Sequence, residues 1–396
     1  MRVAFLFNHD QIHQVAHSLP IAMALAQGGF DGEIIVATTS DRMAREVKRI
    51  AGDLLNTHIH HVELTLSSRS KRLARLLGGI IPAAKLLIYR DNLDFFRSLD
   101  LLIVAEKTSL LLKSRYGLND LKIIHTRHGA GDRAIGFNMA SAGFDHVLCS
   151  GPKIRDRLIA EARVDPARIS VVGYPKFDLV EKPVPVHSLY RPRSSVLYNP
   201  HVSPHLSSWY RHGRDTIDFF RDNDDYELIF APHVMLFERR FVVTIDKLTI
   251  DRAGVIPMDF LRGDNIHIDL GSRCSTDMRY TLAADMYLGD ASSQVYEFLI
   301  QPRPCIFINS HGHDWRGNVN FRHWEAGEVI SSPDELPDAL ARATNLHDSH
   351  FRAVQEKLFA ESFDLQDTPS SRRAAAVIAR LADQRDLIPG RARQAA

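Results

Sequence analysis

The chain has 396 residues and a formal net charge of +1, with 49 Lys and Arg against 48 Asp and Glu. This length exceeds one ordinary hydrophobic core, so about two domains are expected. The balanced charge excludes a bulk electrostatic attraction to nucleic acid. The three cysteines, Cys149, Cys274 and Cys305, lie far apart in the sequence, which argues against a disulfide framework or a zinc site and suits a reducing cytoplasm.

The first stretch, MRVAFLFNHD, contains a short apolar run from Val3 to Phe7. Such a run predicts a buried strand and not a signal peptide. No apolar run in the sequence reaches the roughly 18 residues that a membrane span needs. We therefore expect a cytoplasmic protein.

The first half of the chain alternates short β-rich runs with amphipathic stretches of helical length. The expected strands are 2–7, 33–39, 58–64, 101–106, 122–128, 146–150 and 169–173. The expected helices between them include 12–27 and 152–162. This alternation predicts a parallel sheet with helices on both faces.

The Pro-rich segment 181–195 interrupts the alternation and is expected to be a linker. New strands are then expected at 195–200, 227–232, 265–270, 285–290, 304–309 and 328–332. New helices are expected at 292–300, 334–343 and 370–387. The sequence thus predicts an α/β protein with two Rossmann-like domains that face a cleft, at 1–182 and 194–370, followed by a helix and tail at 371–396. Ligands of such sheets bind beyond the carboxyl ends of the strands.

The stretch HTRHGAG, residues 125–131, follows one of the expected strands. Gly129 and Gly131 would allow a tight turn and a close approach of backbone to a ligand. His128 would then bring a near-neutral base to the ligand, with Arg133 close by. The alternative is a polar turn with solvated histidines.

Other candidates also follow strands. In GYPKFD, Asp178 is expected either to cap a helix or to contact a ligand. In the stretch 198–210, Ser203 is expected to cap a helix whose free N–H groups form an anion site near His201; the alternative is an ordinary helix start. His233 follows the strand 227–232 in a Pro-His pair, and the alternative there is a loop histidine satisfied by its neighbours.

The stretch 285–309 carries the strongest pattern. A strand ends at Asp290, and Ser292 and Ser293 then open a helix that carries Glu297. Hydroxyl groups and exposed N–H groups at a helix start favour phosphate, and Glu297 is placed to reach ligand hydroxyls. A capped helix packed between strands is the alternative.

A basic amphipathic segment at 69–90 concerns location. Its cations, Arg69, Lys71, Arg72 and Arg75, alternate with leucines and isoleucines. Such a segment binds anionic membrane surfaces. The alternative is a core helix with a solvated basic face.

The order of these elements resembles the CDP-glycerol glycerophosphotransferase family of bacterial surface-polymer enzymes. The matching elements, spread over roughly residues 120 to 310, are RHGAG with His128, GYPKFD, Tyr198-Asn199-Pro200, His233 and DASSQVYEFLIQPRP. This chain has Pro-His-Val-Ser where the family usually has Pro-Thr-x-Arg, and Arg127 where the family often has Trp.

The resemblance implies the GT-B architecture and a transferase that moves a polyol phosphate from a CDP-linked donor to a hydroxyl group of a glycan or lipid-linked acceptor. It implies catalytic roles for His128 and His233, and no cofactor or metal. The implied donor-binding residues are Gly129, Tyr198, Pro200, His201, Asp290, Ser292, Ser293 and Glu297.

Three alternatives stay open at this point. A nucleotide-sugar glycosyltransferase or a relative of the UDP-sugar 2-epimerases would share the fold and a helix-bound diphosphate. A non-catalytic nucleotide-binding module of a polysaccharide assembly complex would share the binding site alone. The sequence sets neither the donor base nor the oligomeric state.

Overall fold

The computed structural model describes residues 1–8, 12–77, 83–127, 129–180, 193–238, 242–244 and 249–386, and the chain divides into two compact units. The first unit comprises Met1–Gly129, Phe137–Leu179 and the chain from Phe363 onward. The second unit comprises Ala130–Gly136 and Val180–Ser362. The division therefore differs from the expected one at two places, because the loop 130–136 joins the second unit and the last helix joins the first.

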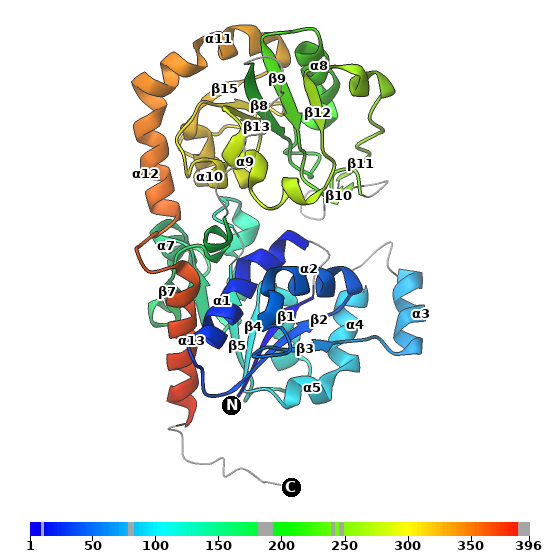
Figure 1. The fold of residues 1–396 in the computed structure, drawn as a ribbon, viewed down its shortest axis with the longest axis vertical. Coiled ribbons are helices and arrows are strands. Elements are labelled where there is room, and N and C mark those ends of the chain that lie inside the picture. The colour runs from blue at the N-terminus through cyan, green and yellow to red at the C-terminus, as the bar shows by residue number, and fades with distance from the viewer. Residues whose placement is uncertain are drawn as a thin grey trace. The chain divides into compact units, whose positions relative to one another are not determined.

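The first unit is built on a seven-stranded sheet of order β3-β2-β1-β4-β5-β6-β7, in which all neighbours are parallel (Figure 1). Its strands are β1 Arg2–Phe7, β2 Glu33–Thr38, β3 His60–Glu63, β4 Leu101–Val104, β5 Lys122–Thr126, β6 His146–Cys149 and β7 Ile169–Val171. The seven strands expected from the sequence are confirmed, most of them shorter than the runs that predict them.

Helices cover both faces of this sheet because its strands are apolar on both sides. In β1, Val3 and Phe5 join one buried cluster, whereas Ala4 and Leu6 join the other. The first cluster includes residues of α1 (Val15–Gln27), α2 (Asp41–Ala51) and α13 (Ser370–Asp386). The second includes residues of α4 (Ala83–Asp91), α5 (Leu93–Arg97), α6 (Leu111–Ser114) and α7 (Pro152–Ala160).

The C-terminal helix α13 packs against α1 and is anchored at its start by Asp178. The two carboxylate oxygens of Asp178 accept hydrogen bonds from the backbone N–H groups of Ser370 (3.3 Å) and Ser371 (2.6 Å). A carboxylate in this position satisfies N–H groups that the helix itself cannot pair. Of the two roles expected for Asp178, the structure shows the cap.

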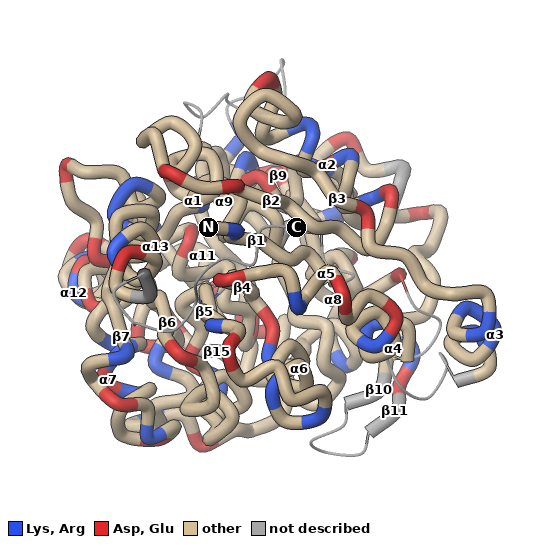
Figure 2. Tube along the Cα trace, turned by 90° about the horizontal axis from the view of Figure 1, so that it is seen from below, with Lys and Arg blue, Asp and Glu red and all other residues tan. Residues whose placement is uncertain are grey.

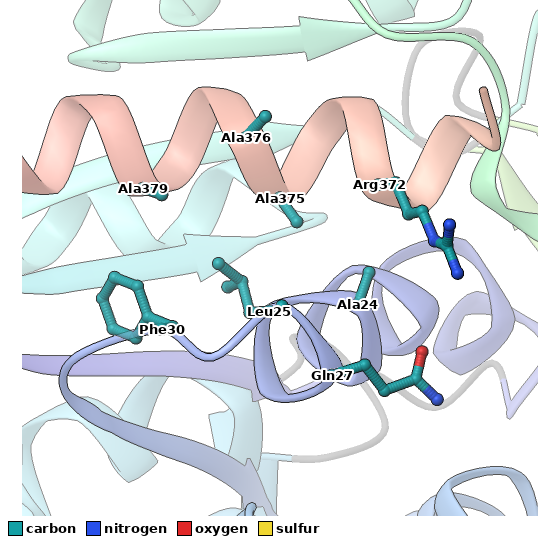
Figure 3. A pocket seen from close by; sticks show the side chains of 9 residues that line it. Ala24, Leu25, Gln27, Phe30, Arg372, Ala375, Ala376 and Ala379 are labelled. Atoms are coloured by element: carbon teal, nitrogen blue, oxygen red, sulfur yellow. The ribbon is translucent and has the colours of Figure 1, made fainter.

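A hollow of about 480 Å³ lies between the end of α1 and α13 (Figure 3). Small side chains form much of its lining, including Ala24, Ala375 and Ala379. Phe30 and Arg372 lie near its two ends in Figure 3. The short side chains let the two helices run side by side and leave space where larger side chains would otherwise meet.

The second unit is built on a six-stranded parallel sheet of order β12-β9-β8-β13-β14-β15. Its strands are β8 Ser194–Asn199, β9 Tyr226–Phe230, β12 Ile266–Ile268, β13 Met286–Gly289, β14 Cys305–Ile308 and β15 Glu328–Ile330. All six are confirmed. A separate antiparallel pair, β10 (Val242–Thr244) and β11 (Thr249–Asp251), was not expected from the sequence.

Helices also flank the second sheet. One face packs against α8 (Trp209–Arg221) and α11 (Leu336–Leu346). On the other face Tyr287 of β13 contacts Phe298 of the short helix α10 (Gln294–Phe298), with ring centroids 5.4 Å apart. The helix α9 (Arg279–Ala283) precedes β13. After α11, a π-helical turn, η12 (His347–Phe351), leads into α12 (Arg352–Ser362), which ends the second unit.

The basic segment 69–90 forms α3 (Ser68–Leu77) and α4, and residues 78–82 lie outside the described part of the chain. Lys and Arg residues gather on α3 (Figure 2), where Leu76 is 80% exposed. Ser70, in contrast, is buried and accepts a hydrogen bond from Arg90 of α4 (2.6 Å). No helix of the described residues is long and apolar enough to cross a membrane.

Candidate functional site

The candidate site lies at the carboxyl edge of the second sheet, between β8 and β13. From β8 the chain proceeds to β9 and β12 on one side, whereas β13, β14 and β15 follow on the other side. The strand order therefore reverses between β8 and β13, which is the place where open α/β sheets bind ligands. The register pairs Asn199 with Gly289, so the residues that leave the sheet here begin with Pro200 and Asp290.

Asp290 is the buried centre of this edge and has no exposed surface. One carboxylate oxygen accepts a hydrogen bond from the N–H of His201 (2.9 Å). The other accepts hydrogen bonds from the N–H (2.6 Å) and the hydroxyl (2.9 Å) of Ser208. The carboxylate thus fixes both ends of the turn that connects β8 to α8.

Burial dominates the ionisation of Asp290. It raises the pKa of this carboxyl to about 7, although the hydrogen bonds from Ser208 and His201 favour the charged form. Burial of a carboxylate in a low-dielectric interior disfavours its charge in this way. Asp290 therefore holds the backbone of His201 and Ser208 in place, and its buried carboxyl group is not a contact for a ligand.

His201 and Arg133 lie together above this support. The Nη1 group of Arg133 is 2.7 Å from Nε2 of His201, and the N–H of Ser203 donates to Nδ1 of the same ring (2.9 Å). Burial, followed by the charge of Arg133, holds the pKa of His201 well below its ordinary value. The ring is therefore neutral, and a neutral imidazole has one acceptor nitrogen, so it accepts only one of these two donors at a time.

His233 follows β9 and lies beside His201. The backbone N–H of His233 donates to the carbonyl of Pro200 (3.0 Å), and its ring centroid is 5.9 Å from that of His201. Burial and the charge of Arg133 lower the pKa of His233 to about 4. Two neutral histidines and one guanidinium thus lie at the ends of β8 and β9, where they favour an anion.

The loop 130–136 comes close to the start of α10. A Cβ atom added to Gly131 would lie 2.8 Å from the Cβ atom of Ser293, so only glycine fits without a shift of the backbone. Ser293 itself is exposed. The paired glycines of HTRHGAG are explained in part by this approach, and in part by Gly129, whose φ of 80° favours glycine.

Asp132 fixes the same loop and was not expected from the sequence. Its Oδ2 atom accepts hydrogen bonds from the N–H of His323 (3.0 Å) and from the hydroxyl of Tyr296 (2.7 Å). The same oxygen lies 3.0 Å from Nδ1 of His323, whose Nε2 lies 3.2 Å from the backbone carbonyl of Asp290. Both side chains of the pair are almost fully buried. His323 has no local motif, so only the fold reveals it.

Several candidates from the sequence lie beneath the surface of the site. Tyr198 is fully buried and its hydroxyl lies 2.9 Å from that of Ser208. Ser292 donates its hydroxyl to the side-chain oxygen of Asn199 (2.8 Å). Glu297 is buried in α10, a helix of only five residues. These residues hold the edge together, and the exposed hydroxyl of Ser293 is better placed for a ligand.

The prediction for Ser203 is wrong in one respect. The helix expected near Pro204 begins at Trp209, so Ser203 does not cap it. The chain turns first, with the carbonyl of Ser203 accepting hydrogen bonds from the N–H groups of Leu206 and Ser207 (both 3.0 Å). The turn forms because Asp290 binds the backbone of both His201 and Ser208.

His128 lies outside the described residues, so its expected role as a base stays a prediction. Among the described residues, no group of three or more His, Cys, Asp and Glu side chains is arranged to hold a metal ion.

Comparisons with known proteins agree with this architecture. No protein-family model matches the chain, and no curated protein sequence does. Among solved structures, the wall teichoic acid polymerase TagF matches at a TM-score of 0.60 and 13% identity, over 98% of this chain and 90% of that one. A UDP-N-acetylglucosamine 2-epimerase matches at 0.59 and 13%, over 98% of each chain. The glycotransferase of kitacinnamycin matches at 0.54 and 13%, over 96% of this chain and 98% of that one.

The fold is therefore that of the GT-B class, with two Rossmann-like domains. The match spans nearly the whole chain in each case, including the first hundred residues, where the sequence carries only a generic pattern. At identities of this order the likeness shows the fold alone.

Proposed function

We propose that the chain is a transferase whose donor is a nucleoside diphosphate-linked compound, bound at the carboxyl edge of β8 and β13. The observation that carries the proposal is the joint placement of Arg133, His201 and His233 at the strand-order reversal of the second sheet. A diphosphate is the part of such a donor that this set of groups recognises.

The chemistry of the three side chains suits phosphate oxygens. The guanidinium of Arg133 supplies a permanent positive charge and planar N–H donors. The neutral ring of His233 carries one N–H donor, whereas the ring of His201 lies against Arg133 and holds its guanidinium in place. The charge of Arg133 is the second cause, after burial, that lowers the pKa values of both rings, and an anion bound at this place offsets that part of the shift.

The same groups suit the chemical step. When a nucleotide leaves, negative charge grows on the phosphate that stays with it. Fixed donors in a poorly hydrated site stabilise such charge without reorganisation. Asp290 and Asp132 act as positioning residues in this proposal, since they hold the backbone on which the donors stand.

The finer proposal is transfer of a polyol phosphate from a CDP-linked donor, with His128 as general base on the acceptor hydroxyl. The ordered motifs of the sequence support it, and so does the likeness in fold to TagF, a wall teichoic acid polymerase. The 2-epimerase and glycotransferase structures match about as well, so nucleotide-sugar chemistry is the second candidate.

Thermal stabilisation by nucleotides tests the proposal. The panel comprises CMP, CDP-glycerol, CDP-ribitol, UMP, UDP-sugars and GDP-sugars. Stabilisation by cytidine compounds alone supports polyol-phosphate transfer, whereas stabilisation by uridine or guanosine compounds supports sugar chemistry. Arg133→Met should abolish the shift, and Arg214→Met, an exposed arginine of α8 in the same unit, should not. No shift with any compound would overturn the proposal.

A second measurement separates an enzyme from a binding module. His128→Ala should lose turnover and keep the thermal shift with the donor. A donor that binds to the natural chain without turnover on any hydroxyl acceptor would favour the non-catalytic alternative.

A further inference from the structure

We infer that His323 holds the loop 130–136 in place as a doubly protonated imidazolium, so that loss of a ring proton weakens anion binding beside Arg133. The protonation of the ring follows from its two hydrogen-bond partners. The effect on binding rests on the proposed function, because Arg133 belongs to the proposed donor site. His323 itself is a positioning residue, since its buried ring acts on a ligand only through the loop.

Both ring nitrogens of His323 face oxygen acceptors. Nδ1 lies 3.0 Å from the side-chain oxygen Oδ2 of Asp132, and Nε2 lies 3.2 Å from the backbone carbonyl oxygen of Asp290. A neutral imidazole carries one N–H group, so its second nitrogen would place a lone pair against an oxygen. An imidazolium carries two N–H groups and satisfies both contacts. The geometry therefore gives the ring both protons.

Neither partner of the ring can take the role of donor. Oδ2 of Asp132 also accepts hydrogen bonds from the hydroxyl of Tyr296 (2.7 Å) and from the backbone N–H of His323 (3.0 Å). Three donors on one oxygen favour the charged carboxylate, which only accepts. The carbonyl of Asp290 has no proton to give, and it accepts the indole N–H of Trp324 as well (2.9 Å).

Burial makes the two charges depend on each other. The side chains of His323 and Asp132 are 3% and 0% exposed. Charges in such a place are stable when they are paired and hydrogen-bonded. Loss of a ring proton would leave the carboxylate of Asp132 buried without its counter-charge, and it would set a nitrogen lone pair against an oxygen. The contact would then change from attraction to repulsion.

The pair fixes the part of the loop that meets the proposed donor. Asp132 lies between Gly131, which approaches Ser293, and Arg133, whose guanidinium is 2.7 Å from Nε2 of His201. A loop that Asp132 no longer holds does not keep the guanidinium at this distance. The protonation of one buried ring is thereby coupled to anion binding at the carboxyl edge of β8.

Other titratable groups near the ring belong to neighbouring elements. Among the described residues, they are His201 after β8, Asp290 after β13, Tyr296 of α10, Arg322 and Glu325 of the turn η10 (Val319–Ala326) that carries His323, and Glu361 of α12. Arg322 is paired with Glu361 (2.7 Å). Asp290 adds a pH dependence of its own, because burial raises the pKa of its carboxyl group to about 7. A test of His323 therefore needs Asp290→Asn as a second background.

Nitrogen NMR of the full chain, labelled at histidine, measures the protonation of the ring directly. An imidazolium gives two signals of protonated nitrogen, whereas a neutral ring gives one protonated and one unprotonated signal. The signals that disappear in both His323→Gln and His323→Asn identify this ring. We expect an imidazolium in the natural chain at neutral pH and a neutral ring in Asp132→Asn. A neutral ring in the natural chain would overturn the inference.

Binding of CDP-glycerol and UDP-glucose, measured by calorimetry across pH, tests the coupling. Both diphosphates are esterified at each end and keep their charge, so the pH dependence belongs to the protein. The natural chain should bind its probe about fivefold or more weakly at about pH 9 than at about pH 6. His323→Gln should bind weakly at both pH values. Asp290→Asn should keep a fall in affinity that Asp290→Asn with His323→Gln lacks.

The control is His350→Gln, an exposed histidine of the same unit, which should leave the pH dependence unchanged. A natural pH dependence in His323→Gln would overturn the coupling between the ring and the loop. If neither probe binds to the natural chain at any pH, the proposed function fails. The NMR signals of the natural chain and of Asp132→Asn still decide the charge of the ring in that case, so the two failures are distinguishable.

Discussion

Replacement of Asp290 by asparagine should change how the stability of the protein depends on pH. The folded pKa of Asp290 is about 7, against an ordinary value of 3.8. A carboxyl group with a raised pKa binds a proton more tightly in the folded than in the unfolded chain. Its contribution to stability is therefore present below the unfolded pKa and is lost as the pH rises toward 7.

The magnitude follows from the width of this window. Each pH unit between the two pKa values costs about 1.4 kcal/mol of unfolding free energy, so a change from about pH 5 to about pH 7 costs roughly 3 kcal/mol. Asparagine cannot ionise and removes this slope. Asparagine also replaces one acceptor oxygen with an NH2 group, so the backbone N–H of either His201 or Ser208 loses its acceptor. This loss lowers the unfolding free energy by about 1–3 kcal/mol at every pH.

Urea denaturation of both chains at several pH values measures the difference. Asp290→Asn should be the less stable protein at about pH 5, and the gap should narrow or close by about pH 8. Asp215→Asn, an exposed carboxylate of α8, is the matched control and should leave the pH dependence unchanged. A constant gap between Asp290→Asn and the natural chain would refute a raised pKa at this site.

Three further predictions concern single contacts. Gly131→Ala should weaken donor binding and cost about 1–3 kcal/mol of stability through its clash with Ser293, and Ser293→Gly in the same chain should restore the stability but not the donor binding, as measured by denaturation and calorimetry. The natural chain should lose stability as the pH falls from 6.5 toward about 4, because the ring of His233 binds a proton less readily in the folded chain than in the unfolded one. His233→Gln cannot titrate and should lack this part of the pH dependence in urea denaturation. Asp178→Ala should cost about 1 kcal/mol in denaturant unfolding through loss of the α13 cap, with no effect on nucleotide binding.

The fold could be predicted from the sequence because the strands of a parallel sheet are short, continuous and apolar. Runs such as Arg2–Phe7 and Cys305–Ile308 are buried on both faces and stand out between amphipathic helices. The pair β10–β11 could not be placed so easily, since a small antiparallel hairpin lacks that signal. The packing of α13 on the first unit could not be predicted either, because the contact that caps it joins Asp178 to Ser370, which are 192 residues apart in the chain.

The candidate site was predicted only in part. Residues that follow strands, such as His201 and His233, can be found from the sequence because strand ends define the ligand edge. The sequence could not show that Asp290 and Ser292 are buried structural residues whereas Ser293 is exposed to a ligand, since only the fold reveals burial. His323 pairs with Asp132 over 191 residues, and no local pattern announces such a contact.

The two units place a buried carboxylate at the same point of their sheets. Glu106 follows β4 and Asp290 follows β13, in each case the strand just beyond the reversal. Burial raises the pKa of both groups, and both accept backbone N–H groups of a neighbouring turn. A carboxyl group held this way organises the neighbouring turn at a cost in stability. Mutation should separate support from binding in the second unit, since Asp290→Asn should change stability first and Arg133→Met should change anion binding first. If neutral variants of the two carboxylates weakened anion binding without changing stability, the carboxylates would have to be counted among the ligand contacts.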